Sequence, residues 1–246
     1  MNIDLIKLIK VFDEHNEEYQ GHTTSIIEIF GEDLNAGLFK HYLDNLTKKK
    51  TKILPYKVKT GWPQGKGPQL DRWIKAGKIL YQTEIKSWCC FQTGGGYKLP
   101  INASVEKIKK EVERKWQREL GREYVVNNKT TKDIASVNKV LVEMKVPKEI
   151  KKEEFNKVKP LVIHWMPISA KGVKPFSSVS LKSIGIKNIK TKENKSIKIP
   201  ESFKEINYFS CSLYIRELLN KNITELNLNL PNANKRIDII NEISKL

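Results

Sequence analysis

One segment, residues 69–88, constrains the fold of this chain more than any other. Its sequence, QLDRWIKAGKILYQTEIKSW, holds two β-type runs with alternating side chains on either side of Ala76 and Gly77. Such alternation is typical of half-buried strands, and a short Gly-containing break between two of them predicts a β-hairpin. We therefore expect strands over 69–75 and 78–88 that lie antiparallel in one sheet.

The second of these strands gathers polar side chains on one face. Successive side chains of a strand point to opposite faces, so Gln82, Glu84 and Lys86 share a face, with the last two about 7 Å apart along the strand. If a two- or four-residue loop is centred on residues 76–77, Asp71 faces Gln82 and lies diagonal to Glu84. A three-residue loop would put Asp71 on the opposite face, unless a bulge restored the phase.

Two carboxylates and an ammonium in one patch suit metal-assisted hydrolysis of a phosphodiester. Mg²⁺ is held by carboxylate oxygens and keeps several waters, so an ion between Asp71 and Glu84 would bind the phosphate and lower the pKa of a bound water. The backbone carbonyl of Ile85 would add a ligand. Lys86 would orient or deprotonate the water, or stabilise the charge that develops on phosphorus. Mn²⁺ is an expected substitute for Mg²⁺.

The remaining segments predict an α/β (α+β) fold with a central mixed sheet flanked by helices. We expect residues 1–170 to form a domain with N-terminal helices, and residues 171–246 to form a basic C-terminal extension, either separate or part of the same domain. The predicted helices span 3–12, about 24–46, 104–120 with Ser104 as N-cap, and regions near 210–220 and 232–244; the predicted strands add 52–59, 139–146 and 159–166.

The charge of the chain favours a polyanionic partner. Lys and Arg number 45 against 28 Asp and Glu, which gives a formal net charge of +17. Lys171, Lys174 and Lys182 belong to a lysine-rich stretch over 171–198 and are candidates to contact DNA phosphates, although a solvated loop explains them equally well. Arg72 is a candidate to lie near a DNA groove.

Several classes of protein are disfavoured. The three cysteines form no CxxC pair, which argues against a zinc site or a disulfide framework. The N-terminus is amphipathic and acidic, unlike a signal peptide, and no apolar run approaches the roughly 20 residues of a membrane span. We therefore expect a cytoplasmic protein with no membrane partner. His164, in an apolar strand, is interpreted as a core histidine with satisfied hydrogen bonds.

The hairpin resembles the motif of the PD-(D/E)XK nuclease superfamily, which includes many restriction endonucleases. The matching residues are Asp71 in GPQLDRW and Glu84, Ile85 and Lys86 in LYQTEIKSW. The predicted order of elements over about residues 24–170 also resembles the αβββαβ core of that family. The resemblance implies that Asp71 and Glu84 bind Mg²⁺ and that Lys86 assists the attacking water.

Two further features bear on this resemblance. Some members of the superfamily add a glutamate from the helix before the first core strand, a place that Glu28 or Glu32 would take here. Leu70, not proline, directly precedes Asp71, a departure from the pattern in the family name.

A rival triplet, Glu143-Met144-Lys145, lies on an expected strand with Asp133 upstream. The 71/84/86 set is preferred because it belongs to a hairpin that a helix and further strands follow. The sequence thus predicts a magnesium-dependent endonuclease of restriction or defence type that acts on double-stranded DNA. A non-catalytic DNA-binding module and an RNA nuclease are the alternatives, and palindromic cutting would require a homodimer.

Overall fold

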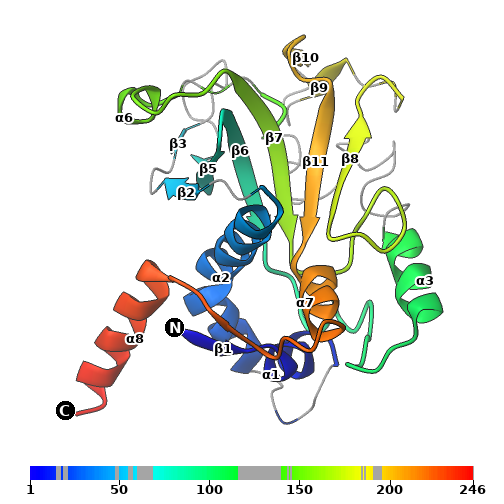
Figure 1. Ribbon diagram of the computed structural model, residues 1–246, viewed down its shortest axis with the longest axis vertical. Helices are drawn as coiled ribbons and strands as arrows, with labels where there is room; N and C mark the ends of the chain where they lie inside the picture. Colours follow the sequence, from blue (N-terminus) through cyan, green and yellow to red (C-terminus); the bar gives the residue numbers. More distant parts are fainter. Residues whose placement is uncertain are drawn as a thin grey trace.

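The protein has a six-stranded mixed sheet with helices packed on it, which confirms the predicted α/β class (Figure 1). It is seen here as a computed structural model. The structure describes residues 1–14, 18, 22–47, 50–54, 58–59, 69–115, 140–142, 144, 146–183, 185, 187–190 and 196–245.

The sheet combines an antiparallel half with a parallel half. Along its first three strands each neighbouring pair is antiparallel, the third, fourth and fifth strands run parallel, and the last strand is antiparallel to its neighbour. Parallel neighbours require a crossover connection, so a long excursion must separate the third strand from the fourth. In spatial order the strands are β2 (Thr51–Leu54), β5 (Arg72–Ala76), β6 (Ile79–Lys86), β7 (Lys157–His164), β11 (Glu205–Ser210) and β8 (Phe176–Ser180).

The sheet continues past residue 170, where we placed the boundary of the C-terminal extension. β8 and β11 come from this C-terminal part and pair with each other, and β11 also pairs with β7. We did not predict these two strands from the sequence, because both are short and β8 lies within the lysine-rich stretch over 171–198.

Three helices cover one face of the sheet and its lower end in Figure 1: α1 (Leu5–Phe12), α2 (His22–Thr47) and α7 (Cys211–Leu219). Side chains provide the N-caps of two of them: Asp4 accepts from the Lys7 amide, and Ser210 accepts from the Leu213 amide. Leu38 and Phe39 of α2 are fully buried in the apolar core on this face, with Ile74 of β5.

The opposite face of the sheet packs against irregular chain. Here the prediction of a strand over 139–146 is wrong for its described part, because residues 140–142 form a turn and a bend. Val140 and Val142 are buried on the sheet, and their carbonyls accept hydrogen bonds from the Gln82 side-chain amide, at 3.0 Å for Val142. The Gln82 side chain thus supplies to these two carbonyls the hydrogen bonds that a neighbouring strand would otherwise donate. Glu143 and Lys145 of the rival triplet, and Asp133, lie outside the described residues.

Shorter elements complete the fold. The predicted Ser104 cap is confirmed, since its hydroxyl accepts from the Lys107 amide at 3.2 Å at the start of α3 (Val105–Lys115). Helix α8 (Pro231–Ile243) projects from the body in Figure 1. Among the described residues no helix combines the length and apolarity that crossing a membrane requires. The other elements are β1 (Asn2–Asp4), β3 (Val58–Lys59), β4 (Gln69–Leu70), α6 (Lys148–Lys151), β9 (Asn188–Lys190), β10 (Ser196–Lys198), β12 (Glu225–Asn227) and α8 (Pro231–Ile243).

Candidate active site

The predicted hairpin is present, with its turn one residue later than expected. β5 and β6 are joined by a two-residue turn, Gly77 and Lys78, and Trp73 pairs with Gln82. Gly77 has φ 58°, a conformation that favours glycine and that suits two-residue hairpin turns. The later turn changes the partner of each residue by two positions along β6. Because side chains alternate with a period of two, each side chain stays on the face of the sheet that the sequence predicts.

Asp71 lies at a bend between β4 and β5, and its carboxylate reaches the neighbouring strand. Its Oδ2 accepts a hydrogen bond from the Ile85 backbone amide at 2.8 Å. Extending the observed register by one residue sets Asp71 opposite Glu84, where we had expected it opposite Gln82 and diagonal to Glu84. The carboxylate of Asp71 therefore lies against the backbone of β6 at the residue that follows Glu84.

Glu84 and Lys86 form an ion pair within this strand. The Lys86 Nζ atom is 3.0 Å from Glu84 Oε1; the Glu84 side chain is 1% exposed and that of Lys86 is 19% exposed. The Nζ atom also lies 5.8 Å from the ring centroid of Trp88, a separation that allows a cation–π contact. A buried carboxylate thus sits behind an ammonium that remains partly open to solvent.

His164 adjoins this pair from the next strand. The parallel register of β6 and β7 pairs it with Lys86, so the two side chains share a face of the sheet. Burial, and secondarily the charge of Lys86, lowers the pKa of His164 to about 3. Both its ring nitrogens are buried without a hydrogen-bond partner in the described structure. The interpretation of His164 as a buried residue is confirmed, but its hydrogen bonds are not satisfied there.

Of the two glutamates expected from the preceding helix, the structure describes the side chain of Glu32. Glu28 lies on α2, and its side chain is outside the described part of the structure. Glu32 and Asp33 of the same helix contact the guanidinium of Arg72, with Nη2 at 3.1 and 3.3 Å from their carboxylates. Arg72 is buried and also donates to the Asp71 carbonyl at 2.7 Å. We therefore assign Arg72 a structural role in place of the expected contact with a DNA groove.

The three candidate lysines separate into two locations. Lys171 and Lys174 are exposed on the loop that runs from the end of β7 to the start of β8. Because Ser210 of β11 pairs with His164 of β7, and Phe209 pairs with Phe176 of β8, this loop leaves and rejoins the sheet at the end where Lys86 lies.

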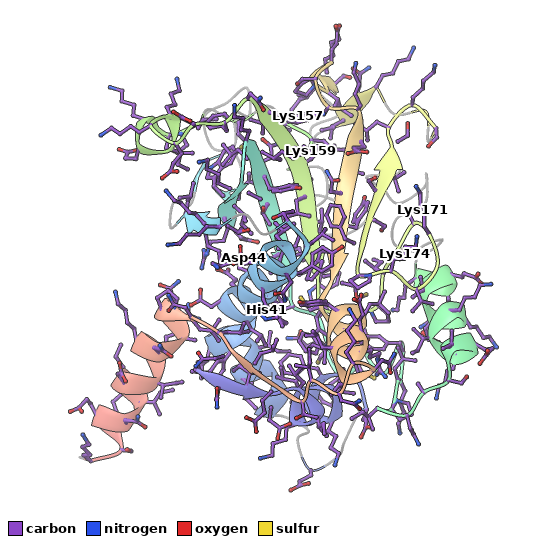
Figure 2. All side chains as sticks on the ribbon, viewed as in Figure 1. His41, Asp44, Lys157, Lys159, Lys171 and Lys174 are labelled. Carbon is purple, nitrogen blue, oxygen red and sulfur yellow. The ribbon has the colours of Figure 1, made fainter. Side chains whose placement is uncertain are left out.

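Lys182 follows β8 at the other end of the sheet. Figure 2 shows Lys171 and Lys174 beside α3, apart from Lys157 and Lys159 at the opposite end of β7. The structure therefore brings two of the three lysines to the end of the sheet that carries the candidate site.

A second buried charged cluster, which the sequence had not suggested, ties α1 to α7. Asp13 accepts hydrogen bonds from Tyr97 at 3.1 Å and Trp165 Nε1 at 2.7 Å through Oδ1, and from Ser212 and Arg216 through Oδ2. Burial raises the pKa of the Asp13 carboxyl, while Arg216 opposes this effect. A single aspartate just after a predicted helix gave no signal that it would be the centre of such a network.

The donor atoms at the hairpin are compatible with a hard divalent ion. Asp71 and Glu84 offer carboxylate oxygens, and Mg²⁺ commonly uses one or two carboxylates together with water and phosphate oxygens. Within the described parts of the chain, no three His, Cys, Asp or Glu side chains are grouped so as to hold a metal by themselves. As far as the described His, Cys, Asp and Glu side chains go, a metal bound here would therefore rely on the two carboxylates together with other ligands such as water and phosphate oxygens.

Comparisons of the chain with protein-family models, with curated proteins and with solved structures find no match.

Proposed function

We propose that the protein is a magnesium-dependent endonuclease that hydrolyses phosphodiester bonds of double-stranded DNA, of the kind used in restriction or defence. The observation that carries the proposal is the arrangement of three groups. The Asp71 carboxylate contacts the Ile85 amide at 2.8 Å, one residue from Glu84, and Glu84 in turn is 3.0 Å from Lys86. The resemblance to the PD-(D/E)XK pattern adds support, because it assigns these same residues.

The order of elements is consistent with this proposal. Helix α2 is followed by antiparallel strands β2, β5 and β6, then by α3, the one-turn helix α6 and β7, which is parallel to β6. An αβββαβ core has this succession, although the short strands β3 and β4 come between β2 and β5 here. The element order alone does not specify an activity, so the proposal rests on the site.

The side chains have complementary roles in the proposed reaction. Bound Mg²⁺ would be held by Asp71 and Glu84, beside the Ile85 backbone, and would supply a polarised phosphate and a water of lowered pKa. Lys86 stabilises the negative charge that develops on phosphorus, or orients the attacking water. In the protein alone its ammonium offsets the buried charge of Glu84, which keeps the carboxylate in place before substrate arrives.

The cutting assay uses supercoiled plasmid, purified protein and either Mg²⁺ or EDTA. We expect cutting with Mg²⁺, none in EDTA, and a decrease of at least about 100-fold for Asp71→Asn and Glu84→Gln. The matched control is Glu205→Gln, which breaks another Glu–Lys pair of the same sheet, 2.8 Å from Lys159, and should cut normally. Binding of plasmid without any cutting would support a DNA-binding module, and preferential cutting of RNA would support an RNA nuclease.

The lysine loop gives a separate test of how DNA is held. Replacing both Lys171 and Lys174 with alanine should weaken binding of duplex DNA and reduce the slope of log affinity against log salt by about 1 for each DNA phosphate that is no longer neutralised. Lys182→Ala, at the other end of β8, should leave the slope unchanged. Equal effects at both ends of the sheet would contradict the proposed placement of DNA.

A further inference from the structure

His164 is a buried polar residue whose place in the fold the proposed reaction does not yet explain. It is 1% exposed, and neither ring nitrogen has a hydrogen-bond partner in the described part of the chain. A buried polar group left in this state costs about 1–3 kcal/mol. Native proteins seldom retain such a group without a function for it.

The surroundings hold the imidazole beside the proposed catalytic lysine. His164 is the register partner of Lys86, on the adjacent parallel strand. Its ring lies 6.4 Å from that of Trp88, roughly edge to face, and 6.4 Å from that of Tyr208, roughly stacked. Trp88 is also the ring next to the Lys86 ammonium, at 5.8 Å. Trp88 therefore lies beside both residues.

Chemistry also relates the two residues. An ammonium has three N–H donors, and the 3.0 Å contact with Glu84 uses one of them. A neutral imidazole has one acceptor nitrogen, and burial keeps His164 uncharged at neutral pH. A protonated imidazole would repel Lys86, whereas the neutral ring can accept from the ammonium.

We propose that His164 is a positioning residue for Lys86: its neutral imidazole accepts a hydrogen bond from the ammonium through one bridging water, and so fixes Lys86 for the reaction. The effect on cutting rests on the proposed nuclease function. The proposed water-bridged link between the two side chains does not, and it can be tested without any activity.

The first experiment measures the link itself. Imidazole ¹⁵N resonances of the full-length protein report the tautomer and hydrogen bonding of each histidine, and His164→Gln identifies the His164 signals. We expect Lys86→Met to shift these signals, while Lys159→Met, which alters a lysine at the far end of β7, leaves them unchanged. Unshifted signals in Lys86→Met would overturn the proposal, whether or not the protein cuts DNA.

The second experiment measures cutting by a pair of variants. His164→Phe keeps an aromatic ring without nitrogen and should lower kcat by about 10- to 100-fold with little change in KM, as is typical when a residue that orients a functional side chain is removed. His164→Gln, which restores a polar acceptor, should recover most of the rate. Normal kcat in His164→Phe would refute a positioning role. Inactive wild-type protein would instead refute the nuclease proposal, and the ¹⁵N comparison would still decide whether the two side chains interact.

Discussion

Replacing Lys86 with methionine should destabilise the folded protein, because it leaves the buried carboxylate of Glu84 without its ammonium partner. The change removes the ammonium 3.0 Å from Glu84, whose side chain is 1% exposed. Breaking one side of a fully buried ion pair costs about 3–5 kcal/mol, because the remaining charge is left without compensation. Lys86 is 19% exposed, so water screens part of the interaction. We therefore expect a decrease of about 2–3 kcal/mol in the free energy of unfolding.

Urea unfolding followed by tryptophan fluorescence measures this decrease, since Trp73 and Trp165 are fully buried. Lys159→Met is the control: its partner Glu205 is 36% exposed, and the change should cost less than about 1 kcal/mol. The double variant Glu84→Gln/Lys86→Met should be destabilised by at least about 1 kcal/mol less than the sum of its single changes, because no buried charge remains unpaired.

The reasoning fails if Lys86→Met unfolds at the same urea concentration as Lys159→Met and if the double variant is additive. Such a result would mean that Glu84 is hydrated or otherwise compensated, and that the two side chains are not coupled in the folded protein.

Three further predictions concern other parts of the molecule. In the unfolded chain His164 has a pKa near 6.5, whereas in the folded protein burial, and secondarily Lys86, lowers this pKa to about 3. The free energy of unfolding should therefore fall as the pH drops from 6.5 to 3, by up to about 1.4 kcal/mol per pH unit. Unfolding curves of His164→Phe should lack this part of the acid sensitivity. Asp13→Ala leaves the Arg216 guanidinium buried without its carboxylate and should cost about 3–5 kcal/mol by urea unfolding, and a change below about 1 kcal/mol would contradict the role of the cluster. Gly77→Val places a β-branched residue at φ 58° and should cost about 1–3 kcal/mol, whereas unchanged stability would mean that the turn relaxes.

The hairpin was predictable because alternation has a period of two. The sequence could not decide between a turn at residues 76–77 and one at Gly77 and Lys78, and the later turn changed the partner of Gln82. With either turn the alternation of side chains puts Asp71 on the same face of the sheet as Glu84, so the prediction of a shared face did not depend on the position of the turn. The hydrogen bond from the Ile85 amide to Asp71 depends on a local bend at residue 71, which the pattern of apolar and polar residues does not predict.

The strand expected over 139–146 shows the opposite situation. Its apolar residues are buried, as their character predicts, but the described part is irregular chain. Gln82 hydrogen-bonds to its carbonyls, so they do not need a neighbouring strand. The apolar character of a segment predicts that its side chains are buried. Its backbone conformation also depends on which group, often distant in sequence, hydrogen-bonds to its backbone N–H and C=O groups.

The buried histidine illustrates a further limit. Its position in an apolar run predicted burial correctly, yet the absence of a partner for its nitrogens in the described structure depends on β6, β11 and the residues around them. The neighbourhood of Lys86 and His164 arises from a parallel pairing between segments more than 70 residues apart in sequence. Only the folded arrangement could reveal it.

Binding of Mn²⁺, followed by electron paramagnetic resonance, tests most directly whether the carboxylates of the hairpin share a divalent ion. Titrations of the wild-type protein, Asp71→Asn and Glu205→Gln should show one bound Mn²⁺ fewer per chain in Asp71→Asn, and the same number in Glu205→Gln as in the wild type. Equal Mn²⁺ binding by the wild type and Asp71→Asn would show that Asp71 does not help to hold an ion and would contradict the proposed metal centre.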